Sequence, residues 1–318
     1  MLDLIGALTM AVAALPPTQS TVLLREKGEP ALAVFHEPGN GSSLLYIHGS
    51  TFPTALSIAY RLDGSSWADD LHARGFDVWS LDFAGYGGSD RPAVNSKRAE
   101  IPGRAAEAER EIERVVRYIK ARRKVARVSL IAHSWGTLAA GMFAARHPGE
   151  IDKLVLFGPV AQRQGHRQAP ATPSRMVTAK DQWESFQSGV PVGERSPISP
   201  SRFAVWARTY LATDHASSTR NPAAVQVPAG PDADFAEAWS GHFPYDPSPI
   251  IAPTLIVRGE WDPIARDDDA RWLAAAMTSV PGGVRDVKLR RGAHRMHLED
   301  NRQSLFDAVG WFLGSDSQ

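Results

Sequence analysis

The 318-residue sequence contains no cysteine, and this absence removes several kinds of chemistry at once. Disulfides, thiolate nucleophiles and cysteine-ligated zinc are excluded, whereas reducing and oxidising compartments both remain compatible with the chain. The sequence also lacks an excess of charge of either sign, because 35 Lys and Arg balance 35 Asp and Glu. Without a net field that would attract nucleic acid or an anionic membrane, we expect a small-molecule substrate and no nucleic-acid partner.

Long hydrophobic runs are also scarce. The apolar run at residues 4–15 is shorter than the about 20 residues that a membrane-spanning helix needs, so we expect no integral membrane segment. The run has the length of a signal-peptide core, but Asp3 precedes it and no Lys or Arg does. We therefore interpret residues 1–20 as a leader of uncertain fate. A cytoplasmic protein is the first expectation, and an exported one is the alternative.

After this leader, short hydrophobic runs alternate with amphipathic helical patterns. The predicted strands cover residues 21–25, 31–35, 43–47, 77–81, 126–132, 153–157, 254–258 and 284–289. The predicted helices cover residues 66–74, 105–122, 135–146, 267–277 and 301–313. Because such alternation builds parallel sheets, we predict an α/β fold with a mostly parallel eight-stranded sheet and helices on both faces.

The alternation stops between residues 162 and 246, a segment rich in Pro, Ser, Gly and aromatic residues. We interpret residues 162–246 as a mainly helical cap inserted into one core domain, which comprises residues 21–161 and 247–318. The aromatic side chains of the cap favour a substrate with a hydrophobic or aromatic part. The alternative is that many of these rings form the cap's own small core.

The clearest chemical signal is a serine between a predicted strand and a predicted helix. Ser134 follows the strand that begins at Val128, and the residues two places before and after it, Ala132 and Gly136, are small. A sharp strand-to-helix turn that exposes a nucleophilic serine needs small residues at these places. The pattern therefore predicts a nucleophile at Ser134, whereas the alternative is a serine that caps an ordinary helix.

With this serine in place, the chain from about residue 21 to 313 resembles the α/β-hydrolase superfamily of the Ser-Asp-His type, with the cap as its variable part. The resemblance rests on five segments in the expected order: His48-Gly49, Asp82 to Pro92, Ala132 to Gly136, Gly259 to Asp262, and Gly292 to His294. It implies that Ser134 is the nucleophile, Asp262 the acid and His294 the base. It also implies that no cofactor takes part.

Rivals exist for the acid and for the base. Residues 267–269 are three further aspartates, but they fit the first turn of a helix, where negative charge is favourable. His297 lies three residues after His294 and is the rival base. A metal site on these two histidines is the other alternative, but neither a HExxH pattern nor a third ligand is evident, so no metal is predicted. His133 and His48 are interpreted as structural residues.

The resemblance also implies an oxyanion hole and neighbouring substrate contacts. Two backbone N–H groups must meet the negative charge that develops on the carbonyl oxygen, and Trp135 and Ser50 are the predicted donors, with Thr51 as the fallback. Thr51, Phe52 and Trp261 are predicted to contact substrate. Arg295 adjoins the predicted base; we expect it to face solvent, and the alternative is that it attracts a carboxylate-bearing substrate.

The leading hypothesis is a carboxylesterase-like hydrolase that cleaves a small or medium, partly hydrophobic ester through an acyl-enzyme, as a monomer or homodimer. A carbon–carbon bond hydrolase of ring-cleavage products is an alternative, although the loop from Ser50 to Pro53 is not rich in glycine. Lactonase, amidase or acyltransferase activity and a non-catalytic receptor of the same fold are further alternatives. Haloalkane dehalogenases and epoxide hydrolases of the superfamily need Asp where this chain has Ser134.

Overall fold

A single mixed sheet organises the fold. The computed structural model describes residues 19–91 and 101–315, so residues 1–18 of the predicted leader lie outside the described residues. The sheet has eight strands in the order β1-β2-β4-β3-β5-β6-β9-β10. These strands are β1 (Ser20–Leu24), β2 (Leu32–Glu37), β3 (Ser43–Ile47), β4 (Asp77–Leu81), β5 (Val128–His133), β6 (Ile151–Phe157), β9 (Thr254–Gly259) and β10 (Arg285–Leu289). Only the pairings of β2 with β1 and β4 are antiparallel, which confirms the mostly parallel sheet.

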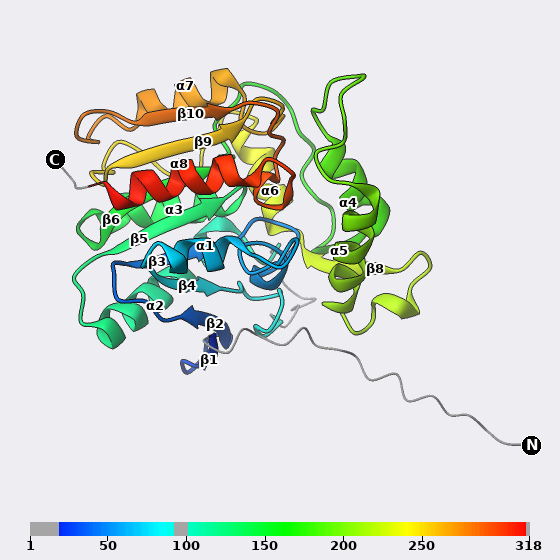
Figure 1. Ribbon diagram of the computed structural model, residues 1–318, viewed down its shortest axis with the longest axis horizontal. Coiled ribbons are helices and arrows are strands. Elements are labelled where there is room, and N and C mark those ends of the chain that lie inside the picture. The colour runs from blue at the N-terminus through cyan, green and yellow to red at the C-terminus, as the bar shows by residue number, and fades with distance from the viewer. Residues whose placement is uncertain (1–18, 92–100, 316–318) are drawn as a thin grey trace, which may run out of the picture.

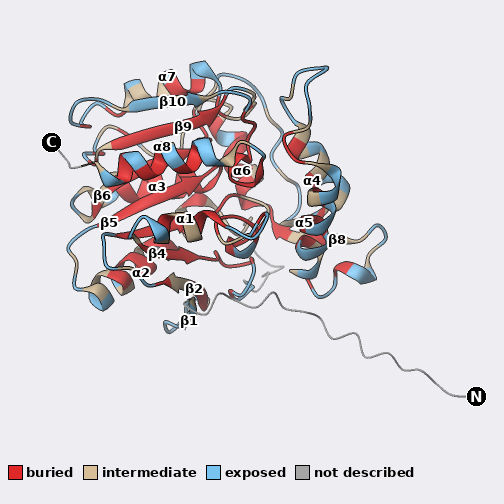
Figure 2. Cartoon of the chain, viewed as in Figure 1, coloured by how far each residue is buried: buried red, intermediate tan, exposed pale blue. Residues whose placement is uncertain are grey.

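Helices cover both faces of this sheet, as the alternation predicts. The helices of the core are α1 (Trp67–Ala73), α2 (Ala105–Arg123), α3 (Gly136–Arg146), α7 (Asp267–Ala276) and α8 (Arg302–Gly314). In Figure 1, α1 and α8 lie in front of the sheet, and α2 and α3 lie behind it. Successive residues of a central strand point to opposite faces, so Leu44 and Tyr46 join one hydrophobic cluster while Leu45 and Ile47 join the other. Both faces of the central strands β3, β4, β5, β6 and β9 are therefore buried, whereas the edge strands β1 and β10 are largely exposed (Figure 2).

The helix α2 shows how the pattern of the sequence produces this packing. Its apolar residues lie on one stripe and are buried: Ala108, Ile112, Val115, Val116 and Ile119. Fully burying a Val or Ile side chain contributes about 1.5–3 kcal/mol relative to leaving it exposed. The helix ends at Lys124, whose φ of 56° lies in the left-handed region that cannot continue a right-handed helix.

The segment from 162 to 246 contains three helices and two strands. They are β7 (Ser174–Thr178), α4 (Ala179–Gln187), α5 (Pro200–Ala212), β8 (Ala224–Pro228) and α6 (Gly230–Ala238). In Figure 1, α4, α5 and β8 lie beyond one end of the core strands. The antiparallel pair of β7 and β8 was not predicted. Pro222 precedes β8 and Pro228 is its last residue. Prolines so close together are typical of a loop, so this short strand was not predicted.

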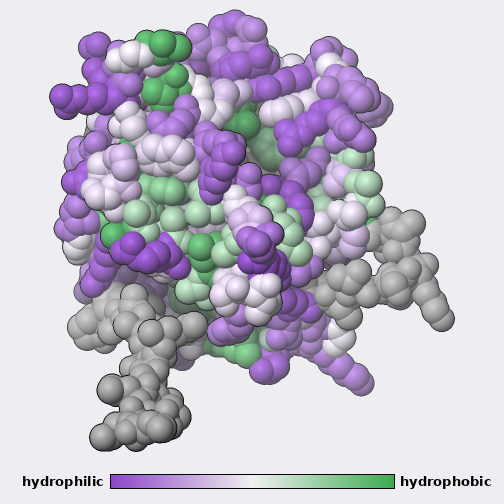
Figure 3. Space-filling view, turned by 90° about the vertical axis from the view of Figure 1, so that its right-hand side faces the viewer, coloured by the Kyte–Doolittle hydropathy of each residue, from purple (hydrophilic) through white to green (hydrophobic). Residues whose placement is uncertain are grey.

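Much of the aromatic content of the cap serves the cap's own packing. Phe186, Trp206 and Tyr210 are buried, and the Trp206 and Tyr210 rings stack with their centroids 5.3 Å apart. The face of the molecule that carries the cap shows small hydrophobic areas separated by hydrophilic residues (Figure 3). None of the helices within 19–91 and 101–315 combines the length and the hydrophobicity that crossing a membrane requires.

Candidate active site

Ser134 lies in a strained turn between β5 and α3. Its φ of 56° is in the left-handed region, which costs a residue with a side chain about 1–2 kcal/mol. A backbone hydrogen bond fixes this turn to the end of β6: the N–H of Ser134 donates to the carbonyl oxygen of Phe157 at 2.9 Å. Two residues on, a side chain at Gly136 would collide with the carbonyl oxygen of His48. The small residue at this place therefore lets the serine turn pack closely on the end of β3.

The loop after β3 approaches the same serine. A Cβ atom at Gly49 would lie 3.1 Å from the Cβ atom of Ser134. His48 shapes this loop: its Nδ1–H donates to the carbonyl oxygen of Gly49 at 2.7 Å, and its Nε2 accepts the N–H of Phe83 at 3.1 Å. Burial lowers the pKa of His48 to about 4, so its ring stays neutral at physiological pH. His48 thus holds two loops together beside Ser134.

The structure brings together Ser134, His294 and Asp262. Ser134 Oγ lies 2.7 Å from His294 Nε2, and His294 Nδ1 lies 2.9 and 3.0 Å from the two carboxylate oxygens of Asp262. A carboxylate only accepts hydrogen bonds, so Nδ1 carries the proton of the neutral ring and Nε2 is free to accept the serine proton. The three residues are 6%, 8% and 4% exposed, respectively. This geometry suits proton transfer from a serine hydroxyl in a site that largely excludes water.

Asp262 is itself held in place by backbone. Its Oδ1 accepts the N–H groups of Ile264 at 2.8 Å and of Ala265 at 3.2 Å. The three rival aspartates pair with basic side chains instead: Asp267 with Arg258 and Lys288, Asp268 with Arg271, and Asp269 with Arg163 and Arg266. Of the four aspartates, Asp262 is the one that contacts His294.

The rival base His297 lies elsewhere in the core. Both of its ring nitrogens lack a hydrogen-bond partner within the described part of the chain. Its ring centroid is 4.8 Å from that of His133 and 5.4 Å from that of Phe157. Burial, followed by the nearby positive charges of Arg295 and His294, lowers its pKa well below the usual value. His297 is therefore a neutral ring packed among aromatic side chains.

The backbone N–H groups of the two predicted oxyanion donors are not used in hydrogen bonds within the described residues. Neither the N–H of Ser50 nor that of Trp135 donates to an acceptor among residues 19–91 and 101–315. The carbonyl oxygen of Ser50 accepts the Tyr86 hydroxyl at 2.7 Å, which orients the loop. The indole N–H of Trp135 donates to Asp234 of α6 at 2.8 Å. The carbonyl oxygen of Ser50 and the indole of Trp135 thus hold the two backbone N–H groups in position.

Asp234 also ties the inserted segment to the core. Besides the indole of Trp135, its carboxylate accepts the N–H of Ala105 at 2.7 Å and pairs with Arg104. A negative charge at the first turn of α2 is favourable because the helix dipole is positive there. Burial raises the pKa of Asp234, and the hydrogen bonds from Trp135 and Arg104 oppose that rise. One carboxylate therefore joins α6, α2 and the residue after Ser134.

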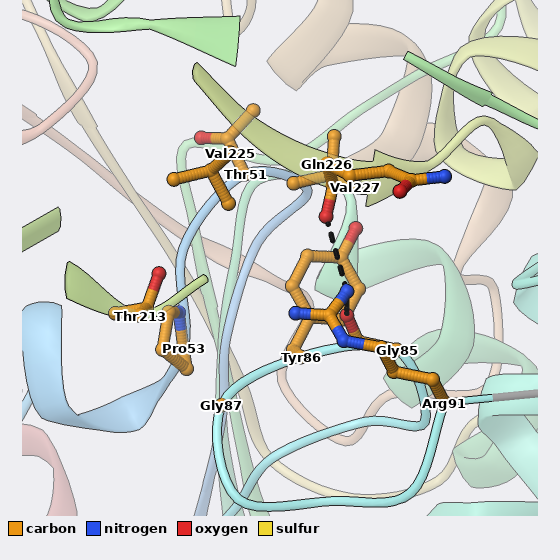
Figure 4. Close-up of a pocket in the computed structure, with 10 residues that line it drawn as sticks. All are labelled: Thr51, Pro53, Gly85, Tyr86, Gly87, Arg91, Thr213, Val225, Gln226 and Val227. Carbon is orange, nitrogen blue, oxygen red and sulfur yellow. Dashed lines mark hydrogen bonds between the residues drawn. The ribbon is translucent and has the colours of Figure 1, made fainter. Parts of the chain in front are cut away.

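The three predicted substrate contacts do not converge on one cavity. Thr51 lines a small depression that is partly open to solvent. The other lining residues are Pro53, Gly85, Tyr86, Gly87, Arg91, Thr213, Val225, Gln226 and Val227 (Figure 4). Phe52 is buried, with its ring edge on Trp206 at a centroid distance of 5.2 Å. Trp261 is half-buried and lies under the guanidinium of Arg291 at 5.5 Å.

The depression lies beside the predicted oxyanion loop, since Thr51 follows Ser50 directly. Arg91 crosses it: Nη1 donates to the carbonyl oxygen of Gly85 at 3.5 Å and to that of Gln226 at 3.3 Å. Figure 4 shows these bonds linking a turn of the core to β8 of the cap. Arg91 thus connects the two parts of the chain at the rim of the depression.

Two residues that support the site were missed by sequence reasoning. Gly158 has a φ of 56°, and a Cβ atom there would lie 3.0 Å from Asp262 Oδ2 and 3.1 Å from His294 Nδ1. Glu299 is buried and accepts the N–H groups of Ala293 at 2.9 Å and Arg295 at 3.0 Å, on either side of His294. Burial raises the pKa of Glu299 to about 8. The only sequence signal for Gly158 was the presence of a glycine directly after a buried strand.

With this geometry in view, comparisons with known proteins decide the family. The family model described as the alpha/beta hydrolase fold matches residues 43–301, which include all of the site. The chain belongs to the alpha/beta hydrolase fold family. In this alpha/beta hydrolase, Ser134 lies at the turn after β5, the fifth strand of the chain, and Asp262 and His294, the predicted acid and base, come later in the sequence.

Among curated proteins, this alpha/beta hydrolase is similar to a haloalkane dehalogenase from Mycobacterium marinum (strain ATCC BAA-535 / M). The two are 24% identical over 289 residues, which cover 86% of this chain and 84% of the relative.

Two solved structures share the fold at low identity. One is 2-hydroxy-6-oxo-6-phenylhexa-2,4-dienoate hydrolase from Rhodococcus sp. strain RHA1, with 16% identity, a TM-score of 0.65 and coverage of 94% of this chain and 100% of the other. The other is a thioesterase domain from the curacin biosynthetic pathway, with 15% identity, a TM-score of 0.61 and coverage of 92% and 99%. Similarity at this level shows the alpha/beta hydrolase fold alone.

Proposed function

We propose that this alpha/beta hydrolase cleaves carboxylic esters through an acyl-enzyme formed on Ser134. The observation that carries the proposal is the continuous chain of contacts from Ser134 Oγ through His294 to Asp262, with distances of 2.7 and 2.9 Å. A serine hydroxyl is a poor nucleophile until an imidazole takes its proton. The carboxylate holds the ring in the required tautomer and stabilises it when it becomes charged.

In the first half of the reaction, His294 Nε2 takes the hydroxyl proton while Ser134 Oγ bonds to the ester carbonyl carbon. The negative charge then resides on the former carbonyl oxygen, and the backbone N–H groups of Trp135 and Ser50 stabilise it. When the tetrahedral intermediate collapses, the bond to the alcohol oxygen breaks. His294 returns the proton to that oxygen, and an acyl-Ser134 ester remains.

In the second half, water takes the place of the alcohol. His294 Nε2 accepts a proton from the water, whose oxygen bonds to the acyl carbon and forms a second tetrahedral intermediate. Collapse breaks the bond to Ser134 Oγ, and His294 returns the proton to the serine. The products are one alcohol and one carboxylic acid, and Ser134, His294 and Asp262 regain their starting states.

Serine at position 134 favours acyl transfer over the activity named for the dehalogenase relative. A serine oxygen that displaced a halide from saturated carbon would form an ether, which water activated by His294 does not cleave. A carboxylate nucleophile would instead form an ester, which water opens at the carbonyl. Turnover therefore requires a substrate whose adduct with Ser134 is itself an ester, and an acyl group meets this condition.

We propose a partly hydrophobic ester of small or medium size as the substrate. The depression next to Ser50 has apolar side chains from both the core and the cap, among them Pro53, Val225 and Val227. Phe52 adds a buried ring at the core–cap contact. Polar side chains, among them Thr51, Arg91 and Gln226, also line the depression. Small-molecule sites typically combine apolar walls with such polar groups. We propose that the cap, residues 162–246, sets the length of the accepted acyl or alcohol part.

The test is the hydrolysis of a chromogenic ester, 4-nitrophenyl butanoate, by the purified protein. We expect Ser134→Ala to lower kcat by at least about 10³-fold, since the nucleophile is lost. Ser129→Ala is a matched control, because Ser129 lies on β5, the strand that ends next to Ser134, is buried and forms a single hydroxyl contact of 3.4 Å with Asp152. It should retain wild-type turnover.

Two results would overturn the proposal. Wild-type rates in Ser134→Ala would place the chemistry on another residue. Absence of turnover by the wild type across esters, thioesters, lactones and amides would instead support a receptor that keeps the fold without the reaction. Circular dichroism of each variant excludes loss of folding as the cause.

A further inference from the structure

Arg295, the residue directly after the predicted base, is buried at the contact between core and cap. It is only 6% exposed, whereas we expected it to face solvent. Its guanidinium carbon lies 5.7 Å from the ring centroid of Phe52 and 5.1 Å from that of Phe186 in α4. The charge is therefore enclosed between the loop that carries Ser50 and the first helix of the cap.

This buried charge has no carboxylate partner. Among the described residues, no Asp or Glu oxygen lies within 4.0 Å of the Arg295 guanidinium. The two other buried arginines are both paired: Arg114 with Glu26 at 3.2 Å, and Arg258 with Asp267 at 2.6 Å and Asp286 at 2.8 Å. Enclosing a charge without a counter-ion is expensive, so buried charges are normally paired. Among the three buried arginines of the described residues, Arg295 is the one without a carboxylate partner.

Hydrogen bonds to neutral groups within the described part of the chain also leave some N–H donors of Arg295 unused. Nη1 donates to the carbonyl oxygen of Ser185 at 3.0 Å, and Nη2 lies 3.4 Å from Gln182 Oε1. Its Nε is buried without an acceptor within the described residues, and so is Nε2 of Gln182, a side chain that is 1% exposed. Two side chains in contact across core and cap therefore each have a buried N–H donor without an acceptor among the described residues.

We propose that Arg295 and Gln182 receive a carboxylate of the substrate, one that is separate from the scissile ester; this rests on the ester hydrolysis proposed above. A carboxylate is planar, accepts from several donors at once and matches the fork of a guanidinium. Its single negative charge would neutralise Arg295. A dianion such as phosphate would leave excess negative charge in a region that already contains Asp262.

The position of Arg295 gives this contact a role in specificity. The residue is covalently next to His294, and its guanidinium carbon lies 5.7 Å from the ring centroid of Phe52, two residues after Ser50. Arg295 therefore neighbours the predicted base in sequence and the predicted oxyanion loop in space. Burial lowers the pKa of Arg295 to about 10, and the carboxylates of Glu299 and Asp262 oppose that decrease. The group thus stays charged at neutral pH and selects esters that carry an anion over neutral esters of the same size.

The test compares two esters of nearly equal size, the 4-nitrophenyl monoester of succinic acid and 4-nitrophenyl butanoate, in which a methyl group replaces the carboxylate. We expect the wild type to prefer the succinate ester in kcat/KM. Arg295→Met should lower kcat/KM for the succinate ester by about 10²-fold and for the butanoate ester by a few-fold at most. Gln182→Leu should reduce the same preference to a smaller extent.

Equal losses for both esters in Arg295→Met would overturn the proposal, and so would a wild type without preference for the anionic ester. Arg114→Met is the matched control, since it removes another buried arginine and should leave the ratio of the two rates unchanged. If Arg295→Met does not fold, Gln182→Leu decides: an unchanged preference in that variant contradicts the site.

A binding measurement separates this proposal from the proposed function. Calorimetric titration of Ser134→Ala with methyl hydrogen succinate and with methyl butanoate needs no turnover. Tighter binding of the anionic ester, lost when Arg295→Met is added, supports the carboxylate site even if no ester is hydrolysed. Equal binding of the two esters contradicts the site even if the wild type proves to be an esterase.

Discussion

His133 is hydrogen-bonded to the backbone of His294: its Nε2 lies 2.9 Å from the carbonyl oxygen of His294. A carbonyl oxygen only accepts, so Nε2 carries the ring proton, and burial lowers the pKa of His133 well below its usual value. The residue before the predicted nucleophile therefore fixes the backbone of the predicted base. The structural role predicted for His133 therefore corresponds to a hydrogen bond with the backbone of His294.

This contact predicts a defect in catalysis when the donor is lost. His133→Phe keeps an aromatic ring of similar size next to Phe157 but leaves the buried carbonyl oxygen of His294 without its donor. An unsatisfied buried group of this kind costs about 1–3 kcal/mol. We expect kcat for 4-nitrophenyl butanoate to fall by about 10-fold with KM little changed. A variant with the kcat of the wild type would show that the hydrogen bond does not position the base.

Gly158 predicts a second way to disturb the predicted base, one that removes no polar group. In Gly158→Ala the added methyl group would lie about 3 Å from Asp262 and His294 at a φ of 56°. We expect the free energy of unfolding to fall by about 1–2 kcal/mol and esterase activity to fall by more than about 10-fold. Gly149→Ala is the matched control, because nothing lies within 4 Å of a Cβ atom there. Full activity in Gly158→Ala, measured beside that control, would contradict the contact.

The strain at Ser134 makes a prediction about stability rather than rate. Both Ser134→Gly and Ser134→Ala lose the hydroxyl, but glycine adopts a φ of 56° with little steric cost. We expect Ser134→Gly to exceed Ser134→Ala in free energy of unfolding by about 1 kcal/mol, measured as the urea midpoint. Equal midpoints, or a more stable alanine variant, would mean that the turn stores no such strain.

Buried Glu111 predicts how stability depends on pH. Burial raises its pKa to about 7, against an ordinary value of 4.5, while the N–H of Ala84 donates to it at 3.0 Å. A carboxyl group with a raised folded-state pKa contributes stability that is complete below about pH 4.5 and is lost as the pH rises through about 7. The protein should therefore be less stable at pH 8 than at pH 5.

The variant Glu111→Gln isolates this effect, since the amide oxygen can still accept the N–H of Ala84. Because one pKa unit corresponds to about 1.4 kcal/mol, we expect the wild type to lose about 2 kcal/mol more than the variant between pH 5 and pH 8. Urea unfolding at the two pH values measures this difference. Parallel losses in the two proteins would show that Glu111 does not titrate in this range.

The core of the fold was predictable because its strands are short apolar runs bounded by turn residues. This pattern alone is enough to predict a strand that is buried on both faces. The predicted strand at 153–157, for example, is β6 at Ile151–Phe157. The geometric neighbours Ser134, Asp262 and His294 could also be named in advance, because the order of the chain in this fold brings loops after successive strands to one edge. Their catalytic roles stay a proposal.

What could not be predicted depends on contacts between distant segments. Arg295 was expected to face solvent, but α4 folds over it and supplies Ser185 and Gln182, more than 100 residues earlier in the chain. The pairing of β7 with β8 likewise joins segments separated by two helices, and neither strand has a strong pattern of its own. Gly158 leaves room for Asp262 and His294, and Glu299 accepts backbone N–H groups on either side of His294. A single sequence shows little sign of either effect.

The most direct test of the account is covalent labelling with a fluorophosphonate, which reacts with an activated serine. We predict one adduct per chain, located by mass spectrometry on the peptide that contains Ser134, with esterase activity lost in proportion to labelling and no adduct in Ser134→Ala. Labelling of a different serine in step with the loss of activity, or full activity after complete modification of Ser134, would contradict the assignment of Ser134 as the nucleophile.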